Sequence, residues 1–131
     1  TMVVSDESLG AAIEDLGSRI YQVRIAALEA VASLGLGGMR GGERAIRAVI
    51  NSLDDLDPDV RRTALKALPE VAQRGDEAAL CAARTRLAVD RNAAVRAAAL
   101  AALGRLAERG NENTLLAVAA QLADWEVCVR Q

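Results

Sequence analysis

Three stretches of nine residues decide the fold: VRIAALEAV at residues 23–31, VRRTALKAL at 60–68 and VRAAALAAL at 95–103. Each begins with a Val-Arg pair and places Ala, Leu or Val along one side of a helix with 3.6 residues per turn. A shorter copy, VRQ, begins at Val129. The four valines, at 23, 60, 95 and 129, are separated by 37, 35 and 34 positions, a spacing typical of two-helix repeats. The sequence therefore predicts a stack of helical hairpins.

Each Val-Arg stretch is preceded by an amphipathic segment whose apolar residues recur at i, i+3 and i+7, which indicates a first helix. Residues typical of helix ends support this division into two helices per repeat. Gly75 followed by Asp76 predicts a helix stop and then a helix start, and Asp57 followed by Pro58 predicts a cap with proline in the first helical position. We expect helices at residues 5–16, 20–34, 42–53, 58–74, 76–88, 92–109 and 111–123, with a last one from about 126.

The predicted fold class is all-α, an α-α superhelix of about three and a half helical-hairpin repeats in a single domain over residues 1–131. A long glycine-rich linker from Ser33 to Gly42 accounts for the first period of 37. Leu65 and Leu100 are expected in the core.

The last unit stops two residues after Val129, so the chain is expected to be a fragment of a longer array and to self-associate through an uncovered apolar end. The units are expected at about 5–34, 42–74, 76–109 and 111–131.

Composition excludes several classes of protein. The chain is 52% hydrophobic but only 2% aromatic, so its core must consist of small and aliphatic side chains, which suits packed helices. No apolar run approaches the roughly 20 residues of a membrane span, and no signal-peptide pattern begins the chain, so we expect a cytoplasmic protein without a membrane partner. The 16 Lys and Arg are balanced by 18 Asp and Glu in the same units, which argues against nucleic acid as a partner.

Several candidate sites fail on their chemistry. The chain has no His, so it lacks the commonest proton-transfer group and metal ligand, and its two Cys are too far apart in sequence for a zinc motif. The glycines at 35–42 resemble a phosphate-binding loop, but Glu43 stands where that loop requires Lys. Cys128 near a helix start is either a redox thiol or an inert small residue. We expect no catalytic residue, cofactor or metal.

From about Asp6 to Arg130, these repeats resemble the HEAT-repeat family, in its short, Ala-rich form with a Val-Arg pair opening the second helix. The resemblance implies that an Asp in the turn between the helices and an Arg early in the second helix pair along the stack as a polar ladder. Ser18 replaces the Asp ahead of Arg24, which is expected to weaken the ladder at that end. The alternative is that each Asp only caps a helix or forms a turn. The matching ladder positions are Asp55, Arg61, Asp90, Arg96, Asp124 and Arg130.

The resemblance also implies a solenoid whose second helices line a concave face, and hence a non-catalytic module for protein–protein interaction or scaffolding. Counting from each Val as zero, core positions fall at offsets 0, 4, 7, 8 and 11, and the opposite side at 2, 6 and 10. Arg62 and Lys66 make a basic centre there, and Ile25 is apolar without a core role. An acidic residue flanked by apolar ones, in a protein or peptide, would fit. The predicted partner-binding residues are Ile25, Glu29, Arg62, Lys66, Ala97, Ala101 and Arg105.

The same residues allow other interpretations. The stripe could be ordinary solvated surface, in which Lys66 and Glu70 form a routine i, i+4 pair. The chain could also belong to a HEAT-type enzyme, such as a bilin-lyase-like protein or an alkylpurine DNA glycosylase, or serve as a structural spacer. A bound pigment or turnover would indicate the enzyme, and a tightly bound protein would indicate the interaction module.

Overall fold

The computed structural model of the chain describes residues 6–34 and 42–107. Over these residues the chain forms six α-helices and no β-strand, which confirms the predicted all-α fold. Most of the predicted glycine-rich linker, the fourth unit with Asp124 and Arg130, its self-associating end and Cys128 lie outside the described residues. The helices are α1 Asp6–Asp15, α2 Tyr21–Ser33, α3 Gly42–Ser52, α4 Pro58–Val71, α5 Glu77–Val89 and α6 Ala93–Leu106.

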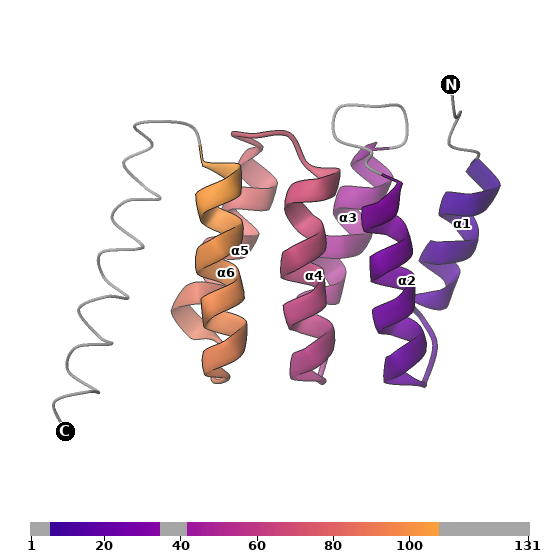
Figure 1. Ribbon diagram of the computed structural model, residues 1–131, viewed down its shortest axis with the longest axis horizontal. Coiled ribbons are helices and arrows are strands. Elements are labelled where there is room, and N and C mark those ends of the chain that lie inside the picture. Colours follow the sequence, from indigo (N-terminus) through magenta and orange to yellow (C-terminus); the bar gives the residue numbers. More distant parts are fainter. Residues whose placement is uncertain (1–5, 35–41, 108–131) are drawn as a thin grey trace, which may run out of the picture.

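The six helices form two layers (Figure 1). The first helices of the hairpins, α1, α3 and α5, lie in one layer, and the second helices, α2, α4 and α6, lie side by side in the other. Each second helix packs against the first helix of its own hairpin, and α4 also packs against both α2 and α6. Since every hairpin covers apolar surface of its neighbour, stability depends on the interfaces between repeats.

The core lies between the layers, and it follows the helical periodicity in α4 and α6. In both helices the residues at offsets 0, 4, 7, 8 and 11 from the first Val are buried. Leu65 at offset 5 is fully buried, but Leu100 at the same offset is 36% exposed, so the prediction that Leu100 belongs to the core was wrong. Offset 5 lies on the side of the helix that faces the following hairpin. Among the described residues, no helix lies on that side of α6.

Side-chain caps fix where most of the second helices begin. Asp57 accepts hydrogen bonds from the N–H groups of the first turn of α4 at 2.8 and 3.4 Å, with Pro58 in the first turn as predicted. Asn92 does the same for α6 at 2.9 and 3.1 Å. Asp76 caps α5 at 2.9 Å. At the corresponding position of α2 stands Ile20, whose side chain makes no cap hydrogen bond, so this helix lacks a stabilising contact that α4 and α6 have.

The second helices end earlier than predicted. Helix α4 ends at Val71 rather than residue 74, and α6 at Leu106 rather than residue 109. In each case the next residue, Ala72 or Ala107, has extended backbone dihedral angles while its N–H still closes the last helical turn. Gly75, with a φ of 85°, turns the chain toward α5, and its N–H donates to the carbonyl oxygen of Leu106 at 2.6 Å.

The burial of Leu65 predicts a large loss of stability on truncation. Leu65→Ala should lower the free energy of unfolding by about 2–5 kcal/mol, because a cavity would remain in a packed interface. Leu100→Ala is the matched control, and it should cost clearly less because that side chain is partly exposed. Urea unfolding followed by circular dichroism measures both. Equal losses in the two variants would contradict the assigned helix orientation.

The missing cap on α2 predicts a stabilising substitution. Ile20→Asp should raise the free energy of unfolding by about 1 kcal/mol, because a carboxylate at this position can accept from the free N–H groups of the first turn. The same urea titration measures the gain, and Ile20→Ala serves as a control that removes the side chain without supplying a cap. A loss of stability in Ile20→Asp would mean that the packing of the isoleucine outweighs the cap.

Candidate functional site

Arg61 connects two consecutive hairpins through its guanidinium group. Its Nη1 donates to the carbonyl oxygen of Asp55 at 2.8 Å and to that of Leu56 at 3.2 Å, both in the turn of its own hairpin. Its Nε and Nη2 donate to the two carboxylate oxygens of Asp90, in the turn of the next hairpin, at 2.8 and 3.2 Å. This bidentate contact fixes both the relative orientation and the separation of the two turns, because the guanidinium is planar and rigid.

Arg24 repeats most of these contacts one hairpin earlier. Its Nη1 donates to the carbonyl oxygen of Ser18 at 2.8 Å, its Nη2 donates to Asp55 Oδ1 at 3.1 Å, and its Nε lies 2.8 Å from Asp55 Oδ2. Each Arg thus uses the backbone of its own turn and the carboxylate of the following turn. The ladder was expected to be weaker beside Ser18, but Arg24 still pairs with the carboxylate of Asp55. The Ser18 hydroxyl accepts the N–H of Ile20 at 3.2 Å, which is the local turn contact that Asp55 makes with Asp57 at 2.9 Å.

Arg96 repeats the first half of this pattern. Its Nη1 donates to the carbonyl oxygen of Asp90 at 2.8 Å, as Arg61 does to Asp55. The carboxylate that the repeat would place beside its other nitrogens is Asp124, which with Arg130 lies outside the described residues.

Asp90 is the only buried charged or polar residue of the described part of the chain. Burial by itself raises the pKa of a carboxyl group. Here the hydrogen bond from Arg61, the N–H of Asn92 at 2.9 Å and the positive charges of Arg61 and Arg86 outweigh burial and hold the pKa of Asp90 below its ordinary value. The carboxylate is therefore ionised at neutral pH and stabilises the native state there.

A groove of about 340 Å³ runs between α2 and α4 on the outer surface of the second-helix layer, here called the α2–α4 groove. Four of the seven predicted partner-binding residues meet in it. Ile25 and Glu29 come from α2, and Arg62 and Lys66 come from α4. The predicted groups of this surface thus come together because α2 and α4 pack directly against each other.

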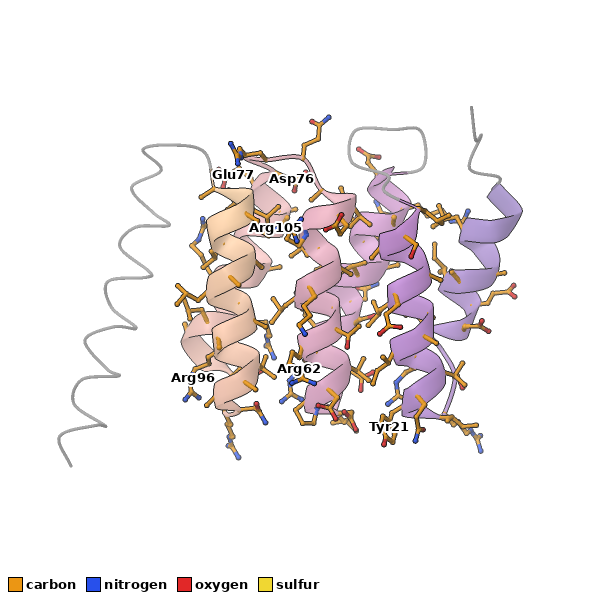
Figure 2. The ribbon with its side chains drawn as sticks, viewed as in Figure 1. Tyr21, Arg62, Asp76, Glu77, Arg96 and Arg105 are labelled. Atoms are coloured by element: carbon orange, nitrogen blue, oxygen red, sulfur yellow. The ribbon has the colours of Figure 1, made fainter. Side chains whose placement is uncertain are left out.

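The other predicted binding residues lie outside this groove. Ala97 and Ala101 are exposed on α6. Arg105 donates to Glu70 of α4 at 2.7 Å, so Glu70 pairs across the helices instead of with Lys66 as the alternative interpretation supposed. Figure 2 shows Arg62 and Arg105 toward opposite ends of the layer. The seven residues therefore do not form one continuous lining.

Sequence reasoning also misjudged part of the lining. Ile25 is partly buried and packs against the core, so the statement that it has no core role was wrong. Offset 2 lies close to the sides of α2 and α4 that face each other, so Ile25 contacts the core there. A count of offsets within one helix does not show which side of it faces a neighbouring helix. Only their closeness to offsets 2 and 6 on the helix surface could have identified the other lining residues from the sequence. These residues are Leu28, Ala32, Asp59, Thr63 and Ala67.

A second depression, of about 270 Å³, lies on the first-helix layer between α3 and α5. Its apolar side chains, Ile46 and Ile50, are joined by charged groups of both signs. One of these, Asp76, already caps α5. It is the weaker candidate because that carboxylate has a structural role.

None of the six described helices combines the length and the apolar character that spanning a bilayer requires. Over the same residues, no three potential metal-ligating side chains are grouped together.

Comparison with known proteins agrees with the repeat pattern. The family model described as HEAT repeats matches residues 7–104, which covers all but the ends of the described helices. No curated protein sequence matches the chain.

The Asp90 pair predicts a loss of stability that depends on pH. At neutral pH, Asp90→Asn should lower the free energy of unfolding by about 3 kcal/mol, because Arg61 would stay partly buried without its counter-charge. Asp54→Asn is a matched control at an exposed carboxylate, where the change should stay below about 0.5 kcal/mol. Urea unfolding at neutral pH measures both.

Acidification should reduce the difference between the wild type and Asp90→Asn. Because the pKa of Asp90 is lowered in the native state, its stabilisation is present above the unfolded-state pKa of about 4 and disappears as pH falls through the native pKa. Urea titrations from neutral pH to about pH 3 follow the change. A difference that stays constant over this range would show that the charge of Asp90 is not what stabilises the pair.

Proposed function

Because the chain belongs to the HEAT-repeat family, we propose that it is a non-catalytic interaction module that binds a segment of a partner protein in the α2–α4 groove. HEAT repeats generally mediate protein interaction or scaffolding and are typically not catalytic. The observation that carries the proposal is the groove itself, which brings two basic side chains, two acidic side chains and an apolar floor onto one surface.

The groove has the composition of a binding surface. Ile25 and Ala32, which are both partly exposed, supply apolar surface, and polar side chains of α2 and α4 lie on both sides of it. Arg62 and Lys66 are four residues apart on α4, where two like charges on a helix are unfavourable by a few tenths of a kcal/mol. Arg62 lies 3.4 Å from the exposed Asp59, a contact too solvated to neutralise it fully. A carboxylate of a partner would relieve the repulsion between the two cations.

The shape of the groove is fixed before a partner arrives. Arg24 joins the start of α2 to the turn before α4, and Arg61 joins α4 to the next hairpin. Since both walls of the groove are held by these ion pairs, binding requires little ordering of the backbone, which favours affinity. The walls suggest the partner segment: an acidic residue facing Arg62 and Lys66, with apolar neighbours over the floor.

The proposal predicts the effect of reversing the basic wall. Arg62→Glu combined with Lys66→Glu should weaken partner binding by about tenfold or more, because the groove would repel an acidic segment. A photo-crosslinking residue at Glu29 identifies the partner, and calorimetry with that partner measures the affinity of each variant.

The control is Arg44→Glu combined with Arg47→Glu on α3, which changes the net charge equally on the other layer. Its affinity should stay close to that of the wild type, and circular dichroism should show both variants folded. If the α3 variant loses binding while the groove variant keeps it, the binding surface lies on the first-helix layer.

A further inference from the structure

The described part of the chain exposes few large apolar side chains, and most of these gather at one edge. Four of the five lie where a first helix turns into a second helix, at the edge where Figure 2 places Tyr21. We name these four the turn edge. They are Ile20, Tyr21, Leu56 and Val89, which are 57%, 40%, 96% and 60% exposed.

Leu56 is exposed on a backbone that is held on both sides. Its own carbonyl oxygen and that of Asp55 accept hydrogen bonds from Arg61. The Asp55 carboxylate accepts the N–H of Asp57 at 2.9 Å and pairs with Arg24. An almost fully exposed leucine thus sits on a fixed turn, and nothing in the described structure uses its side chain for folding.

Ile20 is a second apolar residue at a position where folding favours a polar one. It occupies the N-cap of α2, where Asp57 and Asn92 supply side-chain hydrogen bonds to the later second helices. An isoleucine there gives up the cap and exposes more than half of its surface. Such a departure from a local stability rule points to a role other than folding.

The charges beside the turn edge indicate what kind of surface it meets. Exposed arginines, Arg19 and Arg91, stand in the first and third turns, and the exposed Asp15 lies near Arg19 in sequence. Beside the middle turn, the exposed carboxylates of Asp54 and Asp59 each pair with an arginine. Charges of both signs therefore lie along the edge, which a protein carrying both signs can match better than a uniformly anionic lipid surface.

We propose that the turn edge docks an amphipathic helix of a partner protein, laid across the three turns. Packed helices lie about 8–10 Å apart, and an α-helix rises about 1.5 Å per residue, so one step along the stack corresponds to about six or seven residues of the partner. Apolar residues about seven apart would meet Ile20 with Tyr21, then Leu56, then Val89. Acidic groups near both ends of the helix would match Arg19 and Arg91.

The test uses the full chain and a displayed library of helix-forming peptides of about 18 residues, built from Ala, Glu and Lys, with three randomised positions seven apart. Selected peptides should carry large apolar residues at these positions. Fluorescence anisotropy should then show that Leu56→Ser raises the Kd about tenfold. Leu100→Ser, at an exposed leucine on α6, should leave the Kd unchanged.

Ile20→Asp separates binding from folding. It should raise the melting temperature by restoring a cap, and yet raise the Kd for the selected peptides several-fold. A simple structural role for Ile20 would not give opposite effects on stability and binding. Lys66→Glu, in the α2–α4 groove, should leave the Kd of these peptides unchanged, so failure of this inference and failure of the groove proposal are distinguishable.

Three results would overturn the inference. One is selection that yields no peptides with apolar residues at the randomised positions. Another is an unchanged Kd in Leu56→Ser. The third is Leu56-dependent sedimentation with vesicles of equal parts phosphatidylcholine and phosphatidylserine, which would assign the edge to a lipid surface.

Discussion

The stack depends on one side chain per hairpin, the arginine that follows the first Val of the second helix. Arg61 binds two carbonyl oxygens of its own turn and both carboxylate oxygens of Asp90 in the next turn. A lysine could neutralise the charge but could not span both turns with fixed geometry. Burying such a pair is costly unless its hydrogen-bonding groups are satisfied, and the N–H of Asn92 adds a further bond to Asp90. The equivalent pair of Arg24 with Asp55 joins the start of α2 to the turn before α4, the two helices that form the groove.

The carboxylate of each ladder aspartate has two roles that the sequence can separate. In Asp55 and Asp90 one oxygen accepts a local N–H and also bonds to the arginine of the preceding hairpin. Ser18 keeps the local role through its hydroxyl but carries no charge. The turn geometry therefore survives the substitution, while the ability to neutralise an arginine does not. A ladder position in a repeat sequence should be judged on these two roles separately.

The periodic features of this fold were predictable from the sequence, and the pairings between hairpins were not. The Val-Arg repeat and the caps at Asp57 and Asp76 act within one turn of helix, so local spacing places them. The exposure of Leu100 and the pair of Glu70 with Arg105 depend on which helix lies beside α6 or α4, which a single-helix count does not contain. The same limit explains why Ala97 and Ala101, at the predicted offsets, line no part of the groove.

The two proposed surfaces share a physical feature: in each, the sequence departs from a local preference that would favour folding. Arg62 and Lys66 place like charges four apart on α4, and Ile20 replaces a helix cap. Each departure costs roughly 1 kcal/mol or less, well below the loss expected from breaking a buried ion pair. A stack held by the ladder can therefore tolerate both. Because the ladder arginines also anchor the turn that carries Leu56, the contacts that stabilise the fold also fix the apolar edge in place.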